Sequence, residues 1–319
     1  MKRFCALLLL AVGLHGPAFA QAWPSRPVRI VVPAPAGSSL DLIARTLGDK
    51  LKDRWGHPVV VENRAGAGGL LGMDLVAKAT DGHTLGMGFN GPIAFGPHMV
   101  RKMPYDPAKD LAPVVLATSQ PNVLAVQASN PASTVAEFVA WAKAQGSKLS
   151  YGSVGNGSSS HLTMELFKGE AGFEAVHVPY AGSPPAATSL AAGDTQALFA
   201  VAPALLPLIQ AGRVKLIAAT SLQRTEAMPE LPTFAESGYP GFEALAWNGL
   251  FAPAATQAAT IERINADVNA VLRDPAVRET LSKQGLVPGG GTSAAFKAYI
   301  AQESRTWGAI IRRNGITID

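Results

Sequence analysis

The stretch VPAPAGSSLDLIARTL, residues 32–47, decides the fold of this chain. It follows the apolar run VRIVV, residues 28–32, and leads through two prolines and Gly37 into apolar residues at helical spacing. Ser38 or Ser39 is predicted to cap the helix, and Asp41 lies in its first turn, where the helix dipole favours an anion. Backbone N–H groups at such a helix start have no intrahelical acceptor and are free to bind an electron-rich group. The stretch therefore predicts a strand, a turn suited to an anion, and an amphipathic helix.

Two further stretches repeat this arrangement in the second half of the chain. YGSVGNGSSSHL, residues 151–162, contains two glycines that free the backbone and three serines at a helix start. VPYAGS, residues 178–183, is another turn at the end of a strand. One such turn is typical of any α/β protein and by itself indicates only a capped helix. Three of them, from both halves of the chain, favour a ligand site, because open α/β sheets bind ligands beyond the carboxyl ends of their strands.

The remaining elements predict two α/β domains. Strands at 28–32, 59–61 and 84–89 alternate with helices, which is the pattern of a parallel sheet with crossover helices, and a second series follows after residue 122. The chain passes Pro121 from one strand directly into the next, so it crosses between the domains there. A strand at 247–252 returns, and helices follow. We expect a hinged clamshell in which two crossing strands join domain I (residues 21–121 plus 249–319) to domain II (residues 122–248).

The sequence also leads to three local expectations, on one strand, one helix and one glycine-rich segment. The strand at 59–61 is predicted to be buried, and the helix after Gly69 is predicted to pack through Leu71, Leu75 and Val76. The segment GMGFNG, residues 86–91, matches the G-x-G-x-x-G pattern of dinucleotide sites. Because Pro92 makes a poor helix start, we interpret this match as chance in a chain with 32 glycines.

Residues 1–20 have the layout of a secretory signal peptide. Lys2 and Arg3 precede an apolar run, and Ala18-Phe19-Ala20 is a small-x-small cleavage site, so cleavage is predicted after Ala20. The single cysteine, Cys5, lies in this segment, so the mature chain would contain no thiol. The formal net charge is +4, and the basic residues form no run or basic–aromatic stripe, which argues against nucleic acid as a partner.

Catalytic motifs are absent from the sequence. It contains no G-x-S-x-G, Walker A, C-x-x-C or H-E-x-x-H motif, and its histidines lack metal-ligand spacing, so neither a cofactor nor a metal is expected. One enzymatic alternative stays open, a serine hydrolase using Ser158 and His161, which are three residues apart at a helix start. Glu165 lies next along that face, but no carboxylate that would orient the histidine is evident.

The whole mature chain resembles a known receptor family. The matching segments occur in the family's order, and they include VENRAGAGG, YDPAKDLAPV, HVPYAG and LPTFAESGYPGFEALAWNGLFAP. They resemble the solute-binding receptors of tripartite tricarboxylate transporters, also called the Bordetella uptake gene family. The resemblance implies a periplasmic monomer with a periplasmic-binding-protein fold that binds a small carboxylate in its cleft, catalyses no reaction and delivers the ligand to membrane permease subunits. A ligand sensor for a membrane receptor has the same sequence features and stays an alternative.

The resemblance also implies a set of ligand-binding positions. In the first domain they are Ala36, Gly37, Ser38, Ser39, Asp41 and Asn90. In the second domain they are Gly155, Asn156, Gly157, Ser158, Ser159, His161, Tyr180, Ala181 and Ala200.

Departures from the family pattern suggest the class of ligand. Ala181 occupies a position where the family usually has lysine, and Ala34, Leu40 and Ala200 occupy positions where bulkier or polar residues are common. A second carboxylate would therefore find few partners, so we expect a monocarboxylate or an aromatic acid with an apolar body rather than a tricarboxylate. Asp41 would repel an acid, and we expect its side chain to cap its own helix instead.

Overall fold

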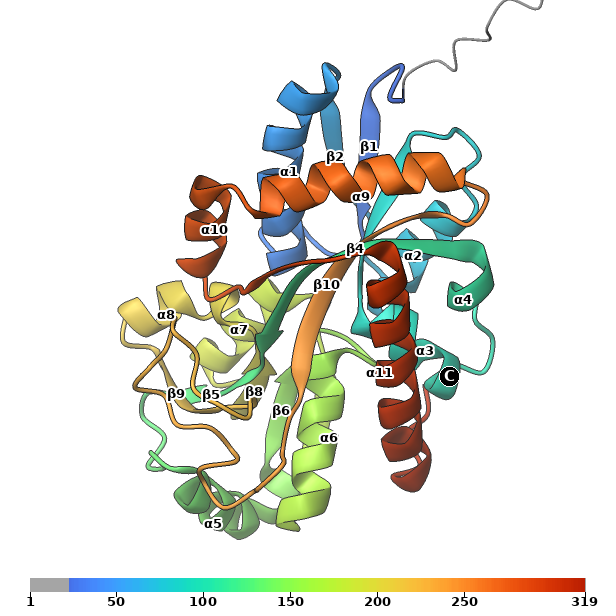
Figure 1. Ribbon diagram of the computed structural model, residues 1–319. Helices are drawn as coiled ribbons and strands as arrows, with labels where there is room; N and C mark the ends of the chain where they lie inside the picture. The colour runs from blue at the N-terminus through green and yellow to red at the C-terminus, as the bar shows by residue number, and fades with distance from the viewer. Residues whose placement is uncertain (1–22, 319) are drawn as a thin grey trace, which may run out of the picture.

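The computed structural model describes residues 23–318 and contains two α/β domains, each built on one β-sheet (Figure 1). The predicted signal peptide, residues 1–20, lies outside the described residues. Two crossing segments join the domains, so the clamshell fold expected from the sequence is confirmed. No helix in residues 23–318 is long and apolar enough to cross a membrane.

The first domain contains a six-stranded sheet in the order β11-β4-β10-β3-β1-β2. β1 pairs in parallel with β2 and β3, whereas β10 runs antiparallel between β3 and β4, so the sheet is mixed and only partly the parallel sheet that was predicted. Its strands are β1 (Val28–Val32), β2 (Val59–Asn63), β3 (Thr84–Phe89), β4 (Leu111–Pro121), β10 (Leu245–Pro253) and β11 (Pro288–Gly290).

Helices cover both faces of this sheet. α1 packs Ile43, Leu47 and Leu51 into the core, and Gly56 ends it in the left-handed conformation with φ 66°, which glycine adopts without a steric penalty. The helices of this domain are α1 (Ser39–Trp55), η1 (Ala67–Gly69), α2 (Leu70–Ala77), η2 (Gly91–Phe95), α3 (Gly96–Met99), α4 (Pro107–Asp110), α9 (Ala258–Leu272), α10 (Pro275–Ser282) and α11 (Ser293–Arg313).

The second domain contains a five-stranded sheet in the order β7-β6-β8-β5-β9. The Thr134–Glu137 capping box predicted by the sequence begins α5, because each side chain binds the backbone N–H of the other residue. The strands are β5 (Val123–Gln127), β6 (Ser150–Ser153), β7 (Val176–Pro179), β8 (Ala197–Ala200) and β9 (Val214–Ala219). The helices are α5 (Val135–Gln145), η3 (Gly146–Lys148), α6 (Ser159–Ala171), α7 (Ser183–Ala192), η4 (Ala202–Ala204) and α8 (Leu206–Gln210).

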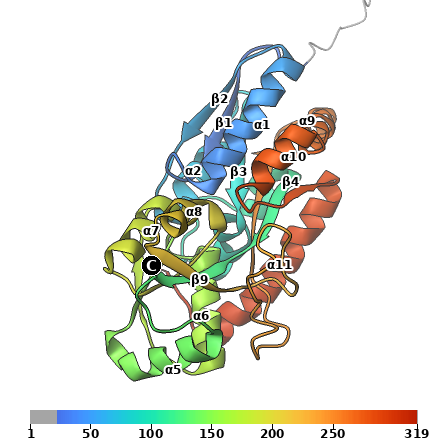
Figure 2. The same ribbon diagram turned by 90° about the vertical axis from the view of Figure 1, so that its left-hand side faces the viewer.

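The two crossing segments lie side by side. Leu245 at the start of β10 pairs with Pro121 at the end of β4. Between β4 and β5, the side chain of Asn122 donates a hydrogen bond of 3.2 Å to the carbonyl of Ala244 on the other segment. Figure 2 shows the first lobe, with α1, α9 and α10, above the second, with α5, α6 and α7. The chain therefore passes between the two domains through two adjacent segments.

Two burial predictions were wrong. The strand at 59–61 was predicted to be buried, but β2 is the edge strand of its sheet and Val60 is 52% exposed. In α2, Val76 is buried as predicted, but Leu71 and Leu75 are 55% and 45% exposed, and Met73 packs inward in their place. β2 is exposed because it lies at the edge of its sheet, and the exposure of Leu71 and Leu75 follows from which side of α2 packs against the core.

The expectation that no helix follows Gly91 was also wrong. A π-helical turn, η2, starts there and continues into α3. Pro92 is tolerated because the first turn of a helix has no intrahelical acceptor for its N–H groups, so the missing proline N–H is not needed.

Candidate functional site

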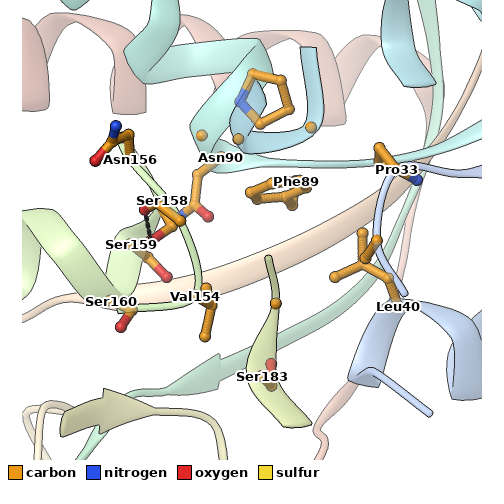
Figure 3. Close-up of a pocket in the computed structure, with 18 of the residues that line it drawn as sticks. Pro33, Leu40, Phe89, Asn90, Val154, Asn156, Ser158, Ser159, Ser160 and Ser183 are labelled. Carbon is orange, nitrogen blue, oxygen red and sulfur yellow. Dashed lines mark hydrogen bonds between the residues drawn. The ribbon is translucent and has the colours of Figure 1, made fainter. Parts of the chain in front are cut away.

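A cavity of about 370 Å³ lies between the two domains. The starts of α1, α6 and α7 all reach it, and so does the turn after β3. Figure 3 shows Asn156, Ser158 and Ser159 on one side of the cavity, Pro33 and Leu40 on the other, and Phe89 and Asn90 between them. The three turns recognised in the sequence therefore converge on a single site.

The first turn presents free backbone donors to the cavity. Ser38 caps α1, because its hydroxyl oxygen accepts a hydrogen bond of 3.3 Å from the N–H of Asp41. Ser39 and Leu40 line the cavity, and their N–H groups have no acceptor among the described residues. The positive end of the helix dipole adds to these two donors, so this helix start is suited to an anion.

Three of the predicted binding residues, Asp41, Ala36 and Gly37, do not line the cavity. The carboxylate of Asp41 is buried and accepts hydrogen bonds of 3.0 Å from the Gly37 N–H, from Arg45 Nε and from Asn63 Nδ2. Burial raises the pKa of Asp41, but these hydrogen bonds outweigh burial and hold it below its ordinary value. Asp41 therefore holds the turn together through the Gly37 N–H, whereas the cap that was expected from Asp41 is supplied by Ser38. Ala36 and Gly37 are exposed to solvent.

The second turn is built in the same way. Ser158 caps α6 by accepting from the N–H of His161 at 3.3 Å, and its own hydroxyl donates to the carbonyl of Gly155 at 2.7 Å. Gly155 and Gly157 have φ values of 134° and 70°, which a residue with a Cβ rarely adopts. The N–H groups of Ser159 and Ser160 have no acceptor among the described residues. The predicted residues Gly155, Asn156, Gly157, Ser158 and Ser159 all line the cavity.

His161, a fourth predicted binding residue, does not line the cavity either. Its ring is buried and stacked on His177 at 3.9 Å between centroids, and its Nδ1 accepts a hydrogen bond of 3.1 Å from the Gly157 N–H. Burial and the charge of Lys168 lower the pKa of His161 to about 4, so the ring is neutral near pH 7 and acts as an acceptor. Because Ser158 binds backbone groups and His161 binds Gly157, the two side chains do not form a nucleophile–base pair.

The third turn presents fewer backbone N–H groups to the cavity than the other two turns. Gly182, with φ 128°, precedes α7, whose first turn contains two prolines and therefore presents few N–H groups. Ser183 lines the cavity together with the predicted residues Tyr180, Ala181 and Ala200. The Tyr180 hydroxyl is hydrogen-bonded to Ser189, which orients its ring.

Several lining residues were missed by sequence reasoning. The glycine-rich segment after β2 reaches the cavity, and its run of glycines after a strand is the same signal that identified the other turns. Residues of the crossing segments also line it, and they lie inside strands that carry no local signal. The missed lining residues include Ala65, Gly66, Ala67, Gly68, Gly69, Leu70, Phe89, Gln120, Asn122, Val154, Ser183, Trp247, Asn248 and Ile318.

The lining of the cavity carries no formal charge near pH 7. No Asp, Glu, Lys, Arg or His is among the described residues that line it. The polar groups are serine hydroxyls, side-chain amides and backbone N–H groups, and the walls between them are apolar residues such as Leu40, Phe89 and Val154 (Figure 3). A bound anion would therefore be neutralised by hydrogen bonds and helix dipoles rather than by a cationic side chain.

Glycines bring the two domains into contact around the cavity. A Cβ on Gly68 would lie 2.5 Å from the carbonyl oxygen of Asn156, which belongs to the other domain. A Cβ on Gly91 would lie 3.0 Å from the Gly157 oxygen, and one on Gly182 would lie 2.7 Å from the ring of Pro35. The domains approach each other this closely only because these positions lack side chains.

Comparison with known proteins finds relatives over nearly the whole chain. A family model described as tripartite tricarboxylate transporter family receptor matches residues 43–316. Protein BugT of Bordetella pertussis is 35% identical over 320 residues, covering 99% of this chain and 98% of BugT.

Solved structures resemble this fold at similar identity. R. palustris Rpa4515 with adipate has a TM-score of 0.90 at 35% identity, covering 92% of this chain and 99% of that chain. MatC from Rhodopseudomonas palustris with bound malate has a TM-score of 0.86 at 30% identity, covering 91% and 100%. The similarity thus extends over both domains.

Proposed function

The chain belongs to the tripartite tricarboxylate transporter receptor family, and we propose on this basis that it captures a small organic carboxylate between its domains and delivers it to a membrane permease. It is a solute-binding receptor by family membership. The identity of the ligand, the place where it binds, the delivery step and export to the periplasm are parts of the proposal.

The observation that carries the proposal is the convergence of helix starts on an uncharged cavity. Free N–H groups at the starts of α1 and α6 belong to opposite domains, so a carboxylate between them would accept hydrogen bonds from both. Hydroxyls of Ser38, Ser39 and Ser159 lie beside these donors. Capture would therefore couple ligand binding to contact between the domains.

The proposed ligand is a monocarboxylate or an aromatic carboxylate with an apolar body. Ala181 and Ala200 line the cavity where charged or polar side chains would serve a second carboxylate, and the walls are largely apolar. The relatives with adipate and malate support a small organic acid as the ligand class. Citrate, with three carboxylates, would leave charge unpaired in this cavity.

The domain division, the oligomeric state and closure on the ligand are further parts of the proposal. We propose the domain division at residues 21–121 plus 249–319 and 122–248, which places the second boundary four residues inside β10. We also propose that the protein is a monomer that closes on its ligand, and small-angle scattering should then record a smaller radius of gyration at saturating ligand. An unchanged profile at saturating ligand would indicate a receptor that is rigid or already closed without ligand.

The binding proposal is tested with purified protein and a panel of acids. Calorimetry and thermal melts with benzoate, branched-chain acids, malate and citrate should rank the monocarboxylates first, and ligand at a hundredfold above Kd should stabilise the fold by about 2.7 kcal/mol. Mass spectrometry of the recovered acid should find it chemically unchanged. Tightest binding of citrate would contradict the ligand class, and turnover of any acid would contradict the receptor.

Delivery to a permease needs a separate test, because a sensor would bind the same ligand. Uptake of the radiolabelled acid by cells of the native host should fall when the gene for this protein is deleted and recover when it is restored. Unchanged uptake together with a lost transcriptional response to the acid would favour the sensor.

A further inference from the structure

Four side-chain amides line the part of the cavity next to the crossing segments, and three of them are engaged. Asn90 donates to the carbonyl of Leu245 at 3.0 Å, and Asn248 donates to the hydroxyl of Thr118 at 2.8 Å. Asn122 donates to Ala244 and to Thr163, both at 3.2 Å. These three amides hold β3, β4, β10 and α6 together, which gives them a structural role.

The fourth amide, Gln120, has no such role. It lies near the end of β4, opposite Ala246 of β10, and it lines the cavity with only 1% of the residue exposed. Neither its side-chain nitrogen nor its side-chain oxygen has a hydrogen-bond partner among the described residues. The other buried polar atoms without a partner in residues 23–318 belong to residues that do not line the cavity.

A buried amide with both groups unpaired destabilises the protein, because its hydrogen bonds to water are lost on folding and not replaced. An apolar residue of the same shape would avoid that penalty. Because Gln120 lines the cavity, rotation of its side chain toward the cavity would let a bound ligand supply the missing partners. Resting on the proposed function, we propose that Gln120 is a specificity-determining residue that binds a second, uncharged polar group of the carboxylate ligand.

The chemistry of the amide selects the kind of group. The Gln120 amide offers N–H donors and a carbonyl acceptor, so a group that both accepts and donates satisfies both sides. A hydroxyl or a carboxamide does this. A second carboxylate only accepts, so it would leave the Gln120 carbonyl oxygen unpaired beside a negative charge. The ligand is therefore a monoanionic acid whose apolar body carries a hydroxyl or carboxamide away from its carboxylate.

Matched ligand series test this inference. Calorimetry on the wild-type protein would compare hexanoate, 6-hydroxyhexanoate, adipic acid monoamide and adipate, and likewise benzoate, the hydroxybenzoates, the carbamoylbenzoates and the benzene dicarboxylates. In at least one series, the hydroxyl or amide should tighten binding about tenfold over the plain monoacid and over the diacid.

Variants assign this gain to Gln120. Gln120→Met replaces the amide with an apolar side chain of similar length. Measured within the variant against the plain monoacid, the gain from the hydroxyl or amide should fall to less than threefold. Gln302→Met, on the exposed face of α11, makes the same replacement outside the cavity and should leave the gain unchanged. Side-chain NH₂ resonances of Gln120 in the wild-type protein should shift with the hydroxylated or amidated acid and not with the plain acid, which tests the contact without a variant.

The outcomes separate this inference from the proposed function. Binding of plain monoacids with no gain from a hydroxyl or amide, or a gain that persists in Gln120→Met, would overturn the role of Gln120 and leave the receptor intact. A diacid that binds more tightly than its monoamide would overturn the selection for an uncharged group. If no acid of either series binds, the proposed function fails and the inference fails with it.

Discussion

Replacing Gly68 by alanine should weaken ligand binding by blocking the contact between the domains. Gly68 lies in the first domain, and an added Cβ would lie 2.5 Å from the carbonyl oxygen of Asn156 in the second. An unstrained carbon–oxygen contact is about 3.4 Å, so the two backbones would have to separate by roughly 0.9 Å. Overpacking of this kind costs about 1–3 kcal/mol. If the ligand binds to the closed arrangement, the dissociation constant should rise about 5- to 150-fold.

A matched control separates this effect from backbone strain. Gly68 has φ 62° and Gly212 has φ 65°, so alanine is strained to a similar degree at both positions. A Cβ on Gly212 meets no atom within 4 Å, and Gly212 lies outside the cavity lining. In the ligand-free protein the two domains can separate and so relieve the clash at Gly68. Both variants should therefore melt at similarly lowered temperatures, whereas only Gly68→Ala should lose affinity in calorimetry. Equal ligand affinity in the two variants would refute the reasoning that the ligand requires this contact.

Three further predictions concern the turns and one buried acid. Ser158→Ala should lower the free energy of unfolding by about 1 kcal/mol, measured by chemical denaturation, and should also weaken ligand binding, measured by calorimetry. Thr134→Ala removes a cap that does not line the cavity, so it should lower the free energy of unfolding without weakening ligand binding. Asp41→Asn should lower the free energy of unfolding by about 2 kcal/mol at pH 7. The pKa of Asp41 is lower in the folded state than the ordinary value of 3.8. The difference in free energy of unfolding between wild type and Asp41→Asn should therefore be present above pH 3.8 and disappear as the pH falls through the pKa of the folded state. A difference that persists in strong acid would contradict the role of the Asp41 charge. Burial raises the pKa of Glu303 to about 7, although Trp247 Nε1 donates a hydrogen bond to it and opposes the shift. Between about pH 4.5 and about pH 7 the folded protein holds a proton that the unfolded chain releases, so the free energy of unfolding should fall as the pH rises through this range. Glu303→Gln should remove this fall, and its denaturation curve at pH 8 should show a free energy of unfolding about 2 kcal/mol higher than that of the wild type.

The helix starts could be predicted because capping is a local interaction. Ser38, Ser158 and Thr134 each bind an N–H three residues further along the chain, so the residues that make the contact are visible together in the sequence. Glycines at left-handed positions are local in the same sense, because the conformation of the turn itself requires them. The strands β1 and β3 also begin and end at the predicted residues.

The side of each turn that faces the ligand could not be predicted in this way. Asp41 and His161 belong to the predicted turns, but both side chains turn away from the cavity to bind the backbone of their own turn. Ala36 and Gly37 lie on the outer side of the first turn. Sequence neighbours of a binding residue share its turn, but their orientation depends on how the helix packs against its sheet.

The sequence by itself determined the two α/β domains and the capped helix starts, because these depend on residues close together along the chain. Tertiary structure alone decided that β2 is an edge strand and that glycines of opposite domains touch, as Gly68 and Asn156 do. It also placed Gln120 unpaired beside the cavity. These features depend on which strands become neighbours and on how closely two domains approach, and contacts between residues distant in the sequence decide both.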